Sequence, residues 1–332
     1  MATSLGNDIP IGNIDAELRK LWLADELNTR ASLTNFAIYS EQENSLEQNT
    51  ALIEEITAEQ ACRAILIHAD PTSGEAGARA WVTAHCRIDP RGHKNICSEQ
   101  LSFELRGPTG DLLRNIVFAH LDSDLPLVLW WQGDLNQNFD ERLYSRIDRL
   151  LINSDRWDQP GSSFAAVRRA LEDTEHRIAI HDLSWTRSYH FRLAIANLFD
   201  DPAALAHLGE LKKVTITHED GVPLAARMLS TWIAARLPGG ADIRFRHVEE
   251  GVGANLTGIE FTTAGDARFT ITREGGSRFL KTTLECTERS HETLSPAGPE
   301  HRSDLILDLM ARAGSNSRYT EILNSPRFHA QL

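Results

Sequence analysis

Apolar positions recur along the chain with two alternating patterns, one typical of helices and one typical of buried strands. The stripe from Val222 to Ile233 repeats at i, i+3, i+4 and i+7, which predicts an amphipathic helix. Compact apolar runs such as Arg63–His68 and Leu125–Trp131 are typical of buried strands. Because helix and strand patterns alternate from end to end, we expect a mixed α/β (α+β) protein.

The pattern gives an expected element order. Expected helices span residues 13–26, 45–60, 112–121, 139–150, 164–173, 187–200, 222–233, 305–312 and 319–323. Expected strands span residues 33–39, 63–68, 81–88, 96–105, 125–131, 214–217, 242–248, 256–262, 268–272 and 279–284. Ser45 is the expected N-cap of its helix. The similar order in both halves fits either two domains of related topology or the ordinary alternation of an α/β chain.

Pro, Gly and Ser cluster without periodicity at residues 157–163, so this stretch is the expected linker. A chain of 332 residues has the length of about two ordinary domains. We therefore expect an N-terminal helix within 1–27, an N-terminal α/β domain over 28–158 and a C-terminal α/β domain over 161–332. Each domain is expected to hold a mixed β-sheet flanked by helices.

Composition narrows the classes of partner. The chain is 41% hydrophobic and 24% charged, which is typical of globular proteins. Its net charge of -13, with no basic run, argues against nucleic acid as a partner. Its apolar runs are shorter than the ~20 residues that span a bilayer, and Met1–Pro10 lacks the features of a secretory signal. Four cysteines are too few for a disulfide scaffold, so we expect a cytoplasmic protein.

Catalytic motifs are missing from the sequence. Gly251-Val252-Gly253 is half of a dinucleotide fingerprint, but Leu256 stands where the third glycine belongs, so a hairpin turn is expected there. Neither a phosphate-binding loop nor a nucleophile elbow occurs. We therefore expect a protein that is not an enzyme, with no catalytic residue and no cofactor.

Two cysteines and two histidines gather around the predicted strands at 81–88 and 96–105. His85 and Cys86 are adjacent and face opposite sides of a strand, so with His93 and Cys97 they do not make a metal site. If the turn between the strands is symmetric, Cys86 lies directly opposite Cys97. This register allows a disulfide, whereas a reducing cytosol favours two thiols, so the two are a candidate redox pair.

Two aromatic segments are candidate partner-binding regions. Consecutive Trp130 and Trp131 end a predicted strand and point to opposite faces, so one ring packs in the core and the other meets a helix or a partner. The alternative buries both rings against flanking helices. We take Trp131 as the candidate.

The second segment runs from Asp182 to Arg192. Trp185, Arg187 and Arg192 are of the types enriched at protein interfaces. The alternative is that Asp182 caps the following helix and pairs locally with Arg187. The two interpretations are compatible, and Asp182, Trp185, Arg187 and Arg192 are all candidate partner-binding residues.

Together these segments resemble the OpcA family of glucose-6-phosphate dehydrogenase assembly proteins. The matching segments occur in the family's order at Arg30–Phe36, Cys62–Ile67, Ile96–Gln100, Leu125–Trp131, Asp182–Arg187 and Arg318–Leu323. The chain departs from the family at Phe191, where many members have Trp; the aromatic ring is kept, but the indole N–H is not.

The resemblance implies a non-catalytic protein that binds glucose-6-phosphate dehydrogenase and promotes its assembly or allosteric activation. That enzyme begins the oxidative pentose phosphate pathway and makes NADPH. An alternative is a sensor or enzyme that binds a sugar phosphate, which needs a phosphate cradle at a helix start. Gly74–Arg79 is the nearest candidate, although Glu75 carries the wrong charge.

Overall fold

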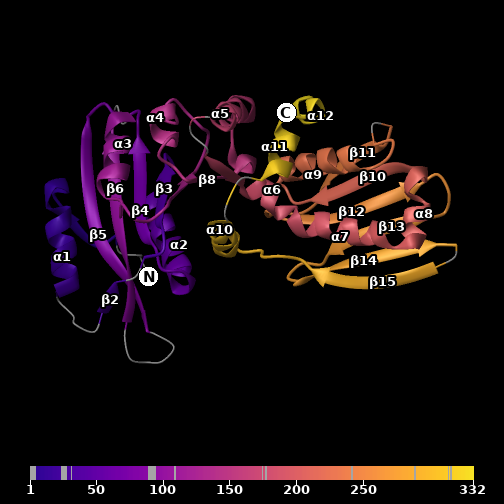
Figure 1. Ribbon diagram of the computed structural model, residues 1–332, viewed down its shortest axis with the longest axis horizontal. Coiled ribbons are helices and arrows are strands. Elements are labelled where there is room, and N and C mark those ends of the chain that lie inside the picture. The colour runs from indigo at the N-terminus through magenta and orange to yellow at the C-terminus, as the bar shows by residue number, and fades with distance from the viewer. Residues whose placement is uncertain are drawn as a thin grey trace. The chain divides into compact units, whose positions relative to one another are not determined.

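The computed structural model describes residues 5–23, 28–30, 32–88, 95–107, 110–173, 175, 178–240, 242–287, 289–312, 314 and 316–332 (Figure 1). They form two compact units, each built around one mixed β-sheet with flanking helices. This confirms the mixed α/β fold expected from the sequence. Within the described residues, no helix combines the length and apolarity needed to cross a membrane.

The first unit contains a sheet that has nine strands within the described residues. Its strands are β1 (Asn7–Ile9), β2 (Asn28–Arg30), β3 (Asn35–Ser40), β4 (Arg63–Asp70), β5 (Gly77–Ile88), β6 (Asn95–Arg106), β7 (Leu127–Trp131), β8 (Arg149–Ile152) and β9 (Ala179–Asp182). Its helices are α1 (Ile14–Leu23), α2 (Ser45–Glu59), α3 (Gly110–Ala119), α4 (Glu141–Tyr144) and α5 (Pro160–Glu172), with a 3₁₀ turn η1 (Ile11–Asn13).

The strands of the first unit follow the order β1-β5-β6-β4-β3-β7-β8-β9, and β2 pairs with β6. The run β6-β4-β3-β7-β8 is parallel, whereas β5 is antiparallel to both β6 and β1. Every residue of the central strand β3 is buried. Burial of both faces is typical of parallel sheets, because the crossover helices cover them.

The second unit has a six-stranded sheet in the described residues, with the order β11-β10-β12-β13-β14-β15. Its strands are β10 (Leu211–His218), β11 (Arg244–Glu249), β12 (Leu256–Thr263), β13 (Arg268–Arg273), β14 (Phe279–Cys286) and β15 (Arg289–Pro296). Its helices are α6 (Leu183–Arg187), α7 (Tyr189–Asp200), α8 (Pro202–Ala206), α9 (Pro223–Arg236), α11 (Ser317–Leu323) and α12 (Pro326–His329), with 3₁₀ turns η2 (Ser154–Arg156) and η3 (Leu208–Glu210). Helix α10 (Arg302–Ala311) is divided between the units.

One face of this second sheet forms the core of its unit. Apolar residues of α7 and α9 pack against the inward-facing residues of β10 and β12–β14. Among the strands that the structure describes here, only β10 and β11 pair in parallel, and the other neighbours are antiparallel. The two sheets therefore differ in topology, which does not favour the related topologies that the element order allowed.

The expected domain boundary is wrong. Pro160 begins α5, and Gly161–Ser163 form the first turn of that helix rather than a linker. The side chain of Ser163 also donates a hydrogen bond to Asp134 at 3.0 Å. The first unit comprises residues 1–153, 157–181 and 306–315, and the second comprises 154–156, 182–305 and 316–332, so the boundaries at 158 and 161 do not hold.

Three local expectations are also wrong. The helix expected over 139–150 is a short α4 followed by β8, because an apolar run alone does not distinguish a buried helix from a buried strand. Asn44, not Ser45, occupies the N-cap of α2, and the Ser45 hydroxyl lies 3.1 Å from His68 Nδ1. The glycines at 251–253 do not form a hairpin, since β10 lies between β11 and β12.

Besides β8, four of the described strands lack an expected counterpart: β1, β2, β9 and β15. β9 is only four residues long, and β15 exposes most of its residues at the edge of its sheet. Neither shows the apolar run that predicts a buried strand. The stretch at 89–94, expected as a turn, lies outside the described residues.

Candidate partner-binding region

Asp182 is the centre of a buried polar cluster in the second unit. Its carboxylate accepts hydrogen bonds from the backbone N–H of Ser184 at 2.9 Å and of Ser154 at 3.2 Å. It also accepts one from the Tyr319 hydroxyl at 3.0 Å. The bond from Ser184 confirms that Asp182 caps α6. Because its charge is buried and surrounded by donors, Asp182 fixes the start of the α6–α7 segment.

Asp155 adds a second carboxylate to this cluster. Its Oδ1 accepts hydrogen bonds from the first-turn N–H groups of Leu224 at 2.7 Å and Ala225 at 3.3 Å, so it binds the N-terminus of α9. Its Oδ2 is buried without a hydrogen-bond partner among the described residues, although the residue as a whole is only half-buried. Burial raises the pKa of this carboxyl to about 6.

Arg187 supplies the positive charge that faces these two acids. Burial lowers the pKa of its guanidinium, while the charges of Asp155 and Asp182 raise it. Its Nε donates to the carbonyl oxygen of Ala254 at 3.0 Å. No ion pair within 4.0 Å joins Arg187 to Asp182 in the described residues. The two side chains therefore do not form the expected direct pair, and their opposite charges attract each other over a longer distance.

Arg192 covers the ring of Trp185. Its guanidinium carbon lies 3.6 Å from the ring centroid, a cation–π geometry. It donates to the Trp185 carbonyl at 3.0 Å and to the Ser188 hydroxyl. Trp185 is only 2% exposed. Arg192 thereby ties α7 to the preceding turn, and Phe191 next to it is buried in the core.

Trp131 lies in the first unit and is separate from this cluster. Its ring centroid is 4.0 Å from that of Tyr39, and its Nε1 donates to the Asp134 carbonyl at 2.9 Å. Both Trp130 and Trp131 are buried, as the alternative interpretation held. In this conformation Trp131, Asp182 and Trp185 offer no surface to a partner, so direct contact with one stays a prediction for them.

Sequence reasoning missed Asp155 and Tyr319. Asp155 precedes the stretch that the sequence suggested as a linker, and Tyr319 belongs to the last segment of the family resemblance. It also missed which residues of the segment reach the surface. On α7 the exposed large hydrophobic side chains are those of Tyr189, 39% exposed, and Leu193, 43% exposed. The buried residues therefore support a helix that exposes two apolar side chains over its first two turns, with Asn197 and Asp200 exposed further along.

The predicted register of the cysteine strands is confirmed. Cys86 pairs with Cys97 in the β5–β6 ladder, their Cα atoms are 4.1 Å apart, and a disulfide joins them. Cys97 is buried and Cys86 is exposed. His85 Nε2 lies 2.8 Å from the Gln100 side-chain oxygen. The described residues contain no group of three or more potential metal ligands.

The segment Gly74–Arg79 does not begin a helix, because Gly77 begins strand β5. The Arg79 guanidinium pairs with Asp8 at 2.5 Å and lies 4.7 Å from the ring centroid of Trp81. It also faces Glu104 at 3.7 Å. The positive charge of Arg79, which a phosphate would need, is therefore already balanced by two carboxylates.

Two family models match the chain in consecutive order. The model described as the glucose-6-phosphate dehydrogenase subunit N-terminal domain matches residues 53–169, and the model described as the corresponding C-terminal domain matches residues 178–323. Together they cover most of the chain. The matched ranges contain all the residues of the buried cluster around Asp182.

Two curated relatives are each described as a putative OxPP cycle protein OpcA. The one from Nostoc punctiforme is 28% identical over 233 residues, which cover 65% of this chain and 49% of the relative. The one from Synechocystis is 27% identical over 197 residues, which cover 57% and 40%. The matched part of the chain thus spans about half the length of these relatives or less.

A solved structure titled as trehalose-6-phosphate from E. coli bound with UDP-2-fluoro glucose covers 67% of this chain and 65% of its own. The sequence identity is 8% and the TM-score is 0.24. A similarity this low carries no argument about fold or function.

Proposed function

The chain belongs to the OpcA family of glucose-6-phosphate dehydrogenase assembly proteins, and on that premise we propose that it binds this dehydrogenase as a non-catalytic assembly factor and allosteric activator. The ordered match of both family models over residues 53–169 and 178–323 carries the proposal. In this role the protein acts in the cytoplasm and supports NADPH production by the oxidative pentose phosphate pathway.

Activation by a binding partner requires a difference in affinity. The protein can favour the active form of the dehydrogenase only if it binds that form more tightly than the inactive one. Coupling free energies between binding and state are typically about 1–3 kcal/mol, which correspond to roughly 5–150-fold changes in an equilibrium. An effect of this size is measurable in enzyme kinetics.

The rigid packing of the α6–α7 segment supports a role in partner binding. Within it Asp182 is buried and Arg187 is half-buried, and Arg192 bridges α7 to Trp185. A helix held this firmly loses little conformational entropy when a partner packs on its exposed Tyr189 and Leu193. Asp182, Trp185, Arg187 and Arg192 then act as supports, with Arg192 half-buried at the border of the surface.

The proposal is tested by titrating the purified chain into glucose-6-phosphate dehydrogenase from the same organism. We expect a complex in size-exclusion chromatography and a higher kcat or lower KM, followed through NADPH absorbance. The chain alone is expected to show no dehydrogenase activity. Absence of both a complex and a kinetic change at micromolar concentrations would contradict the proposal.

A further inference from the structure

Strand β15 is a free edge of the second sheet. Within the described residues it pairs only with β14. The backbone N–H of Ala297 donates to the carbonyl oxygen of Arg278 at 2.9 Å, and these two residues are opposite each other in the register. In an antiparallel ladder every second pair is hydrogen-bonded, so this bond shows which residues of β15 are bonded to β14. The backbone N–H and C=O groups of Ser290, Glu292 and Leu294 therefore point away from β14.

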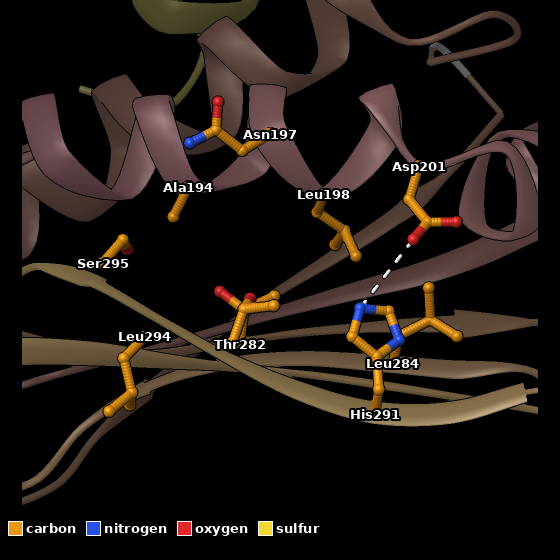
Figure 2. A pocket seen from close by; sticks show the side chains of 10 residues that line it. Ala194, Asn197, Leu198, Asp201, Thr282, Leu284, His291, Leu294 and Ser295 are labelled. Atoms are coloured by element: carbon orange, nitrogen blue, oxygen red, sulfur yellow. Dashed lines mark ion pairs between the residues drawn. The ribbon is translucent and has the colours of Figure 1, made fainter.

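A cavity lies on the inner side of this edge. It has a volume of about 300 Å³ and separates α7 from the β14–β15 hairpin (Figure 2). Asp201, just after α7, closes one end, where it pairs with Arg289 at 3.2 Å and faces His291 at 3.8 Å. The side chains that face the space include Asn197, Thr282, Leu284, His291, Thr293 and Ser295.

The cavity leaves polar groups unpaired. His291 Nδ1 and Ser295 Oγ are buried without a hydrogen-bond partner among the described residues. Buried polar groups in native proteins are nearly always paired. The edge thus has unpaired groups along its backbone and within the cavity beside it.

The outer side of the same edge exposes apolar side chains. Leu294 is 68% exposed and Phe279 is 53% exposed. The register pairs Leu294 with Lys281 and Phe279 with Pro296, so both side chains lie on the face opposite α7. A partner that reaches both faces of this edge therefore meets the cavity on one side and an apolar surface on the other.

From these features we infer that β15 binds an extended segment of the dehydrogenase as an additional strand, an inference that rests on the proposed function. An extended backbone is the group that satisfies a row of strand N–H and C=O groups. Its alternate side chains enter the cavity beside α7 and cover Leu294 on the outer face. Opposite Glu292, whose carboxylate also pairs with Lys281 at 2.6 Å, the segment places a cationic side chain.

A second copy of this chain fits the same edge poorly. The register that pairs all three outward-facing residues of two antiparallel β15 strands places Glu292 opposite Glu292 of the copy. Like charges directly opposite each other destabilise a sheet. The charge pattern therefore favours a different protein as the occupant.

Residue-resolved amide hydrogen exchange tests the inference on the full chain with and without the dehydrogenase. In the free chain the amides of His291, Thr293 and Ser295 are expected to be protected by β14, and those of Ser290, Glu292 and Leu294 to exchange fast. In the complex we expect the latter three to slow by at least about tenfold, because their donors become paired.

A complex that leaves these three amides in fast exchange overturns the inference and leaves the proposed function intact. No complex at all overturns both. Protection that appears in the chain alone as its concentration rises indicates pairing between copies and also overturns the inference.

A matched pair of variants gives an independent readout. Glu292→Pro removes an N–H that the sheet does not use, so the fold is expected to keep its melting temperature. Its affinity for the dehydrogenase is expected to fall about tenfold, since one partner carbonyl loses its donor. Glu292→Ala, which keeps the N–H but loses the pairing with Lys281, is expected to stay within about threefold of wild type. Equal affinities of the two variants contradict the inference, and if Glu292→Pro fails to fold, amide exchange decides.

Discussion

Asp155 shows how burial changes the chemistry of one residue. Its pKa is raised from the ordinary 3.8 to about 6, first by desolvation and also by the charge of Asp182. Between about pH 4 and pH 6 the unfolded chain has lost this proton while the folded chain retains it, so stability falls as the pH rises. The contribution of the Asp155 proton to the free energy of unfolding is therefore fully present below about pH 4 and lost above about pH 6.

We therefore expect Asp155→Asn to become more stable relative to wild type by about 2 kcal/mol between pH 4 and pH 7. Asparagine keeps an oxygen that accepts from the N–H groups of α9, but its side chain does not take up or release a proton between about pH 4 and pH 7. Urea unfolding of both proteins at the two pH values measures the difference. Asp158→Asn, at an exposed position, is the control. An unfolding difference that does not depend on pH would contradict the assignment.

Tyr319 tests the Asp182 carboxylate of the cluster. Tyr319→Phe removes the hydroxyl that donates to buried Asp182, so we expect a loss of about 2 kcal/mol in unfolding free energy. Tyr144→Phe removes a similar bond to Asp173, 3.1 Å long but near the surface, and is expected to cost about 0.5 kcal/mol. Equal losses in the two variants would show that burial does not set the strength of the Asp182 bond.

At the scale of elements, the α6–α7 segment contains both buried residues that stabilise the fold and exposed residues that are expected to contact a partner. Trp185→Ala is expected to lower the unfolding free energy by about 3–5 kcal/mol, because the ring is fully packed. Leu193→Ala is expected to leave stability within about 0.5 kcal/mol and to weaken binding of the dehydrogenase by about 1 kcal/mol. Melting curves and binding titrations distinguish the two. Normal stability in Trp185→Ala, with weaker binding, would instead support direct contact by the indole.

The β5–β6 ladder carries the candidate redox pair. With Cys86 opposite Cys97, thiol counting under denaturing conditions after mild oxidation is expected to find only Cys62 and Cys286 free. The closed loop is short, so oxidation is expected to stabilise the chain by about 2–3 kcal/mol. Cys97→Ser should abolish this shift. If oxidised and reduced protein activate the dehydrogenase equally, the pair has no regulatory role.

At the scale of the whole molecule, the chain passes between its two units more than once. Residues 306–315 belong to the first unit, where Arg149 of β8 donates to the carbonyl oxygens of Met310 and, at 2.9 Å, of Arg312. Residues 154–156 belong to the second unit, where Asp155 binds the start of α9. Neither unit is a continuous stretch of sequence.

Fragments cut at the linker suggested by the sequence should therefore fail to fold. Fragment 1–158 lacks α5, all of β9 and residues 306–315, and fragment 161–332 lacks Asp155. We expect both to show no cooperative thermal unfolding, whereas the full chain unfolds cooperatively. Circular dichroism melting curves of the three proteins provide the measurement. Two cooperative fragments would restore the simpler division of the chain.

The sequence by itself determined the class of fold, most elements, the cap at Asp182, the Cys86–Cys97 register and the family. Each depends on spacing along the chain: helical periodicity, a short side chain before a helix, a count outward from a turn, or motifs in order. These signals can be read from the sequence without knowing which residues pack against each other in the folded protein.

Only the tertiary structure decided which of those residues are buried, and where the units divide. Trp131 and Trp185 have the composition of interface residues, yet packing encloses both. Asp155 and Tyr319 meet Asp182 from distant parts of the sequence, so no local pattern marked them. Strand β15 has no apolar run because it is an edge, and an edge is defined by the absence of a neighbour. Burial and neighbourhood are properties of the folded chain, because residues far apart in sequence create them.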